Sequence, residues 1–198
     1  VTSIKGIIPN HYKAVGQYLV DEFNIKDEQL GVVSGPCHAE EVALERLSYL
    51  TIAALDELKA KTVADCLACN FINTKISNDI FGTEYGAILK NIYAVAAGIA
   101  HGLGYGDNFH AVLMSNAIRE MNDILKQVNK TKRQINDSAY LGDLLVTGYS
   151  NFSRNRTFGN MIGKGYSVQS VIMEMNMVAE GYYATKGVAI LNEGYKIK

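Results

Sequence analysis

Hydrophobic and polar positions follow two alternating patterns over residues 1–78. Short apolar runs bounded by turn residues predict strands, and apolar side chains three or four positions apart predict helices. The predicted strands are Val1–Ile7, Gly31–Ser34, Ser48–Ala54 and Phe71–Ile76. The predicted helices are Tyr12–Glu22, His38–Leu47 and Asp56–Cys69, the last with Asp56 as its N-cap. This alternation indicates part of an α/β layer.

From residue 79 onward the apolar spacing is helical. The first predicted helix is long and almost uncharged, and the second begins with Asp107 or Asn108 as its cap. The predicted helices are Asp79–Gly102, Asp107–Val128, Ser153–Ile162, Val168–Ala179 and Ala184–Glu193, with a short apolar segment at Tyr140–Tyr149. We therefore expect a mostly α fold, with an α/β piece over residues 1–78 and an all-α domain over residues 79–198.

The composition excludes several classes of protein. The 198 residues carry a formal net charge of −1, with Lys and Arg scattered along the chain, so no nucleic-acid partner is expected. No apolar run approaches the length of a membrane span. The three cysteines fit a reducing compartment better than a disulfide framework, which predicts a cytoplasmic protein.

Two of the cysteines, Cys66 and Cys69, have the spacing of a redox or metal motif. A zinc site would lack half of its ligands, because no second cysteine pair or nearby histidine accompanies them, so no metal site is expected. A redox pair stays open as an alternative. The favoured interpretation is two small buried thiols on one helix face.

One lysine, Lys90, stands in a long segment that otherwise carries almost no charge, FGTEYGAILKNIYAVAAGIAHGLG. Burial disfavours an ammonium ion and therefore lowers the pKa of a lysine. A lysine with a lowered pKa can exchange a proton near neutral pH, so Lys90 is a candidate for acid–base catalysis. The alternative is a core-helix lysine whose amine reaches the surface.

A second candidate site lies where Ser153-Arg154-Asn155-Arg156 begins a helix. Free backbone N–H groups at a helix start attract anions, and the Arg154 guanidinium suits phosphate. The preceding segment is apolar except for Asp143 and Thr147, so these side chains need polar partners. An aspartate there can hold or orient a lysine. The alternatives are a helix-capping Asp143 and a polar surface helix.

Seven segments carry a resemblance to a known family. They are Thr2-Ser-Ile-Lys5-Gly6, Ser34-Gly-Pro-Cys37-His-Ala39-Glu40, Gly86-Ala-Ile-Leu-Lys90-Asn, Gly102-Leu-Gly-Tyr-Gly-Asp-Asn108, Gly142-Asp143-Leu-Leu-Val-Thr147, Ser153-Arg-Asn-Arg156 and Val178-Ala-Glu180-Gly. In order and in spacing they resemble the bacterial type of NAD(P)-dependent glycerol-3-phosphate dehydrogenase.

This resemblance implies a reversible reduction of dihydroxyacetone phosphate to sn-glycerol 3-phosphate by NADH or NADPH, for phospholipid synthesis. It implies a helical substrate domain like the carboxyl-terminal domain of 6-phosphogluconate dehydrogenase, preceded by a remnant of a Rossmann-type domain. Lys90 matches the family's proton-exchanging lysine. The family's substrate contacts match Lys5, Gly35, Cys37, Lys90, Asp143, Ser153, Arg154 and Asn155. Its cofactor contacts match Lys5, Ala39, Arg154, Val178 and Glu180.

Two departures from the family pattern affect these expectations. The glycine-rich βαβ half is absent and the likeness ends soon after Glu180, so we expect a fragment with negligible turnover by itself. Cys37 stands where the family usually has Ser or Thr, and a thiol is the weaker hydrogen-bond group. The choice between NADH and NADPH and the formation of a homodimer stay open. The alternative function is a helical interaction or dimerisation module without chemistry.

Overall fold

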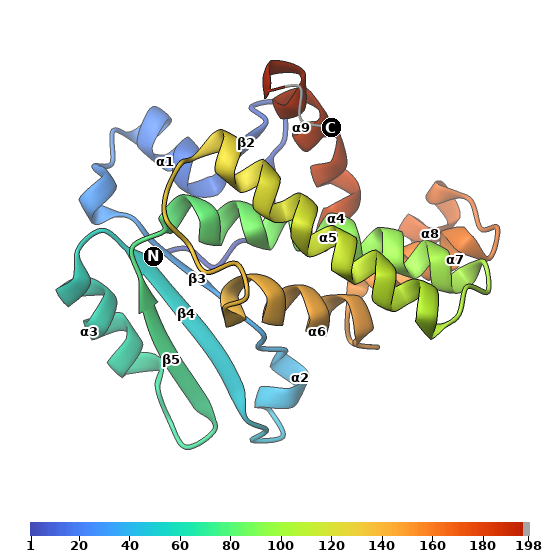
Figure 1. Ribbon diagram of the computed structural model, residues 1–198, viewed down its shortest axis with the longest axis horizontal. Helices are drawn as coiled ribbons and strands as arrows, with labels where there is room; N and C mark the ends of the chain where they lie inside the picture. Colours follow the sequence, from blue (N-terminus) through green and yellow to red (C-terminus); the bar gives the residue numbers. More distant parts are fainter. Residues whose placement is uncertain (196–198) are drawn as a thin grey trace.

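A three-stranded sheet and a larger group of helices make up the structure, a computed structural model that describes residues 1–195 (Figure 1). In sheet order the strands are β3 (Gly31–Ser34), β4 (Ser48–Ala54) and β5 (Ile72–Ser77), with β4 antiparallel to β3 and parallel to β5. Val33, Ile52 and Ile76 lie opposite one another across the strands, where β-branched side chains pack well. Helix α3 (Glu57–Leu67) begins at the capping residue Asp56 and packs two alanines against this apolar face.

Helix α4 (Ile80–Gly102) runs through the centre of the helical part (Figure 1). It begins at Asp79, whose carboxylate accepts a hydrogen bond from the Gly82 N–H at 2.9 Å. The helices packed around it are α5 (Asp107–Val128), α6 (Asp143–Tyr149), α7 (Arg154–Gly163) and α9 (Glu180–Tyr195). Ile88 of α4 and Met121 of α5 are fully buried in the core that these helices share.

Glycines allow α7 to approach α4 closely. A Cβ added at Gly159 would overlap the backbone of Val95 and Ile99, and one added at Gly163, one turn further on, would overlap Ile99 and Gly102. The contacts advance in the same direction along both helices, so α7 runs parallel to α4. The first residues of α7 therefore lie beside the middle turns of α4.

Shorter elements complete the fold: β1 (Ile7–Ile8), β2 (Lys13–Ala14), α1 (Val15–Phe23), α2 (Ala39–Val42), α8 (Val168–Glu174), a 3-10 turn at Asp27–Gln29 and a π-helical turn at Ser138–Gly142. The buried Glu84 carboxylate accepts a hydrogen bond from the Gly16 N–H at 2.6 Å. A negative charge at a helix N-terminus is favourable, so this contact ties α1 to α4. Within residues 1–195 no helix has the length and apolar character needed to cross a bilayer.

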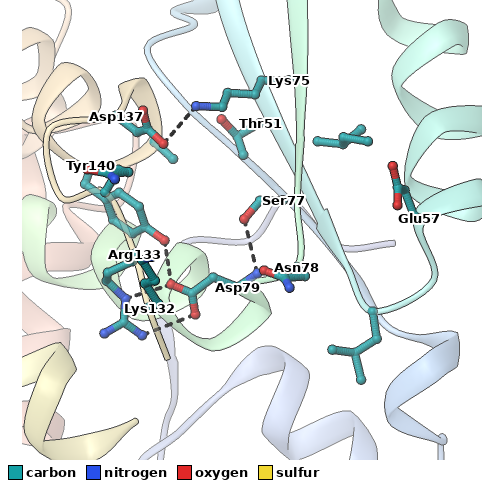
Figure 2. Close-up of a pocket in the computed structure, with 14 residues that line it drawn as sticks. Thr51, Glu57, Lys75, Ser77, Asn78, Asp79, Lys132, Arg133, Asp137 and Tyr140 are labelled. Carbon is teal, nitrogen blue, oxygen red and sulfur yellow. Dashed lines mark hydrogen bonds and ion pairs between the residues drawn. The ribbon is translucent and has the colours of Figure 1, made fainter. Parts of the chain in front are cut away.

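A hollow of about 440 Å³ lies between the sheet and the segment that follows α5 (Figure 2). The Asp79 carboxylate accepts hydrogen bonds from Arg133 Nε and from the Tyr140 hydroxyl, both at 2.7 Å. Lys75 pairs with Asp137 at 2.8 Å on another wall of the hollow. Burial would raise the pKa of Asp79, but the Arg133 and Tyr140 contacts hold it below its ordinary value. These four charged groups are satisfied by one another, which indicates an anchor between the sheet and the start of α4.

The predicted mostly helical fold with a small α/β portion is confirmed, and several element boundaries agree closely. The strands Gly31–Ser34 and Ser48–Ala54 have the predicted bounds. Helix α3 begins immediately after its predicted cap, and α4 begins one residue after its predicted start at Asp79. The predicted strand at Val1–Ile7 is wrong, because there only Thr2 bridges to β3 and Ile7 to β2.

Other boundaries are wrong for local reasons. The helix predicted from His38 ends at Val42, because Glu45 takes a left-handed conformation with φ of 54°. Gly106, rather than Asp107 or Asn108, is the N-cap of α5. Helix α8 ends at Glu174 instead of 179, and α9 begins at Glu180 instead of 184. The two cysteines expected to be buried, at positions 66 and 69, are exposed.

Candidate active site

Lys90 and Asp143 form a buried ion pair where α4 meets α6. Lys90 projects from the middle of α4, and Asp143 is the first residue of α6. Lys90 Nζ donates a hydrogen bond to Asp143 Oδ1, and both side chains are buried. The nearby Thr147 hydroxyl donates to the Asp143 backbone carbonyl at 2.6 Å. The polar side chains of this apolar segment have therefore found their partners within the protein.

A second lysine and a serine complete the surroundings of Asp143. Lys5 Nζ lies 3.8 Å from Asp143 Oδ2, and the Ser34 hydroxyl donates to the same oxygen at 3.1 Å. The Asn91 side-chain amide donates to the Lys5 carbonyl at 3.0 Å and so anchors the segment that carries Lys5. One carboxylate thus faces two ammonium groups from distant parts of the chain.

The pKa values of the pair follow from this arrangement. Desolvation lowers the pKa of Lys90 to about 8, assisted by the charge of Lys5 and opposed by Asp143. Burial alone would raise the pKa of Asp143, but the charges of Lys90 and Lys5 hold it below its ordinary value. The pair is therefore ionised at neutral pH, and Lys90 is close to the pH at which it can both give and take a proton.

The N-terminus of α7 lies on the same cavity. The buried Ser153 hydroxyl caps this helix by accepting from the Arg156 N–H at 3.3 Å. Arg154 is exposed at the cavity wall. A helix start leaves backbone N–H groups without intrahelical partners, and with an adjacent guanidinium it forms an anion site. This end of the cavity suits a phosphate.

Asn155 and Glu180 join α7 to α9. The Asn155 side-chain carbonyl accepts from the Gly181 N–H at 2.9 Å, which fixes the start of α9. Glu180 lines the cavity, and its Oε2 is buried without a hydrogen-bond partner among residues 1–195. Burial raises the pKa of this carboxyl, although Arg154 and the two lysines oppose the shift. A ligand that donates a hydrogen bond, such as a carboxamide, would satisfy the free oxygen.

The turn after β3 forms the opposite wall. Gly35 has φ of 136°, and a Cβ at this position would meet the Tyr49 carbonyl at 2.5 Å, so only glycine fits. Cys37 and Ala39 follow it along the wall. Burial raises the pKa of the Cys37 thiol, so the thiol stays protonated at neutral pH.

All the site residues expected from the sequence line this one cavity, whose volume is about 590 Å³. They are Lys5, Gly35, Cys37, Ala39, Lys90, Asp143, Ser153, Arg154, Asn155, Val178 and Glu180. Sequence reasoning missed His38, which also lines it and has a buried Nε2 without a hydrogen-bond partner in the described part of the chain. Its position between Cys37 and Ala39 was the available signal.

The cavity places a titratable amine at one position and the start of α7 with Arg154 at another, with mixed polar and apolar walls between them. A positioned lysine can transfer a proton to a developing oxyanion and stabilise its charge. An anion site within the same cavity holds a substrate by a group remote from the reacting atoms. The arrangement suits proton transfer on a small phosphorylated molecule.

Sequence comparisons match both parts of the chain to one family. Residues 79–198 match the NAD-dependent glycerol-3-phosphate dehydrogenase C-terminus, and residues 1–60 match the N-terminus of the same family. A glycerol-3-phosphate dehydrogenase [NAD(P)+] of Staphylococcus haemolyticus is 37% identical over 93% of this chain and 56% of its own length. One of Oceanobacillus iheyensis is 38% identical over 94% of this chain and 54% of its own length.

A solved structure supports the same relationship. The crystal structure of glycerol-3-phosphate dehydrogenase from Coxiella burnetii superimposes with a TM-score of 0.90 at 27% identity, over 99% of this chain and 59% of that one. The chain thus spans a little over half the length of these relatives. The C-terminal family match runs to residue 198, so the expectation that the likeness ends soon after Glu180 is wrong.

Proposed function

Because the chain belongs to the NAD-dependent glycerol-3-phosphate dehydrogenase family, we propose that it forms the substrate-binding and proton-transferring part of such an enzyme. The reaction is the reversible reduction of dihydroxyacetone phosphate to sn-glycerol 3-phosphate, which serves phospholipid synthesis. We propose a division at residue 78, with the substrate domain over residues 79–198.

One observation carries this proposal. The buried Lys90–Asp143 pair and the N-terminus of α7 with Arg154 line a single cavity. Reduction of a ketone needs a proton at the developing alkoxide, and a phosphorylated substrate needs an anion site away from the carbonyl. In this proposal the Lys90–Asp143 pair of α4 and α6 serves the first requirement and the start of α7 serves the second, and close glycine contacts pack α7 against α4.

Lys90 has the role of the acid in the direction of reduction. Its ammonium donates a proton to the alkoxide oxygen as the carbonyl is reduced, and the neutral amine takes that proton back in the reverse direction. Asp143 holds the amine in place and stabilises its charged form. Lys5 adds a second positive charge beside the same carboxylate, which favours a negatively charged oxygen nearby.

The start of α7 holds the phosphate in this proposal. Arg154 offers a planar pair of donors, and the helix N-terminus adds backbone N–H groups. Asn155 holds the start of α9 against α7, because its side-chain carbonyl accepts a hydrogen bond from the Gly181 N–H. The binding energy of the phosphate fixes the carbonyl carbon, so the chemistry gains from a group that does not react.

NADH or NADPH supplies the hydride when bound. Lys5, Ala39, Arg154, Val178 and Glu180 are the residues proposed to hold it, and the unpartnered Glu180 oxygen fits a carboxamide donor. Since the chain spans 56% of a curated relative, the rest of the cofactor site is proposed to need residues beyond it. Turnover by the 198-residue chain alone is therefore expected to be negligible. A cytoplasmic location stays a prediction, and the formation of a homodimer stays open.

Isothermal titration of the chain with sn-glycerol 3-phosphate tests the proposal. We expect saturable binding that Arg154→Ala weakens by about ten- to hundredfold, the size of one hydrogen bond to a charged group. Arg119→Ala, at an exposed arginine on α5, is the matched control and should bind like the wild type. A helical interaction module without chemistry would bind no phosphate ester. That result would exclude the proposed function.

A further inference from the structure

His38 lies on the cavity wall, in the segment after β3 and next to Cys37. Its backbone is extended, with φ of −80° and ψ of 132°, and it precedes the short helix α2. Its side chain is half-buried, and Nε2 is buried without a hydrogen-bond partner in residues 1–195. A buried polar atom of this kind costs free energy unless a ligand satisfies it. The position points to a contact with whatever fills the cavity.

The surroundings of His38 define its chemical state. The ring packs at an angle against Phe152, with 6.3 Å between ring centroids. Burial lowers its pKa, and the charge of Lys90 lowers it further, against weaker effects from Glu40, Asp143 and Glu41. The imidazole is therefore neutral at pH 7, and one nitrogen can donate while the other accepts.

The roles proposed above leave one polar group of the substrate unassigned. Its phosphate is assigned to Arg154 and the start of α7, and its carbonyl oxygen to Lys90. The remaining group is the terminal hydroxyl, which both donates and accepts a hydrogen bond. A neutral imidazole nitrogen can bond a hydroxyl whether or not it carries the proton, because a hydroxyl both donates and accepts, whereas a phosphate dianion can only accept.

We propose that His38 Nε2 hydrogen-bonds the terminal hydroxyl of the three-carbon phosphate and so selects substrates with a free hydroxymethyl group over methyl analogues. This inference rests on the proposed function and adds a specificity-determining residue to it. A site that presents a buried polar atom to a hydroxyl rejects the analogue that lacks it, because the polar atom is then left unpaired.

The test compares two ligands that differ by this hydroxyl. sn-Glycerol 3-phosphate and the propane-1,2-diol 1-phosphate of matching configuration are titrated into the wild-type chain, His38→Phe and His38→Gln. We expect the wild type to prefer glycerol phosphate by about tenfold, the size of one neutral hydrogen bond. His38→Phe should abolish the preference and leave diol phosphate affinity within about twofold, and His38→Gln should keep most of the preference.

The outcomes separate this inference from the function on which it rests. An unchanged preference in His38→Phe, or an equal loss for both ligands, would overturn the role of His38 while leaving phosphate binding intact. Failure of the wild type to bind either ligand would overturn the proposed function itself.

If His38→Phe does not fold, imidazole ¹⁵N shifts give the answer in the wild type, whose four histidines allow assignment with His38→Gln. The His38 Nε2 signal should move with glycerol phosphate and stay in place with diol phosphate. Equal movement with both ligands would contradict the proposal.

Discussion

Replacement of Asp143 by asparagine removes the buried countercharge of Lys90 and keeps the size of the side chain. Lys90 would then be a buried ammonium beside Lys5, with an amide in place of its carboxylate partner. An opposite charge in contact shifts a pKa by about 1–3 units. The pKa of Lys90, about 8 in the wild type, is therefore expected to fall to about 5–7 in Asp143→Asn.

The same shift predicts how stability depends on pH. Lysine has an ordinary pKa of 10.5, and the native value is lower, so the unfolded state binds more protons between the two values. The free energy of unfolding therefore rises with pH over this range, starting near pH 8 in the wild type. In Asp143→Asn the rise starts about 1–3 units lower. Since one unit is about 1.4 kcal/mol, this group should cost the variant about 1–4 kcal/mol near pH 5 and little near pH 9.

Lysine ¹³Cε shifts measure the pKa directly in the ¹³C-labelled chain, without any need for turnover. The pH is varied from about 5 to 11, a range that covers ordinary and lowered lysine values. Lys90→Met identifies the signal, and Asp137→Asn, which removes the partner of the exposed Lys75, is the matched control. A Lys90 signal that titrates in Asp143→Asn at or above its wild-type pH would refute the reasoning.

Three further changes have defined outcomes. In a full-length polypeptide that contains this chain, Lys90→Ala is expected to lower kcat by about two to four orders of magnitude, the usual contribution of acid–base catalysis. The assay is NADH oxidation with dihydroxyacetone phosphate, and a near-normal kcat would show that Lys90 is not the acid. Gly98→Ala would overlap the α7 backbone and should destabilise the chain by about 1–3 kcal/mol in urea, whereas Gly194→Ala, which has open space, should not. Arg133→Met strands a buried carboxylate and should cost about 3–5 kcal/mol while ligand affinity in the folded fraction is kept. Lys75→Met, at an exposed pair, should cost about 1 kcal/mol or less.

Local signals explain the elements that the sequence predicted well. Two strands have the expected bounds because apolar and β-branched residues make up most of each one. The starts of α3 and α4 were predictable from Asp56 and Asp79, whose carboxylates accept from backbone N–H groups three residues later. These signals act within one helical turn, so the sequence contains them.

Long-range contacts explain the elements that the sequence did not reveal. Helix α9 starts at Glu180 rather than 184, and its first turn is held by the Asn155 side chain from another helix. Asp79 is hydrogen-bonded to Arg133 and Tyr140, which are more than fifty positions away in the sequence, and no local pattern predicts these contacts. No short-range rule contains such pairs.

The candidate site divides in the same way. Lys90 and Asp143 were suggested by their charge within apolar segments, because a buried charge needs a partner, and the structure pairs them with each other. The role proposed for Arg154 was inferred from its position at a helix start. His38 was missed because only the structure shows that it lines the cavity and that its Nε2 has no hydrogen-bond partner within residues 1–195.

A crystal structure of the chain with sn-glycerol 3-phosphate tests the central claim, that one ligand joins the amine of Lys90 to the start of α7. We expect the phosphate at Arg154 and the N-terminal turn of α7, and the secondary hydroxyl within about 2.6–3.2 Å of Lys90 Nζ. A ligand bound in the hollow beside Asp79, or with its secondary hydroxyl turned away from Lys90, would contradict the account.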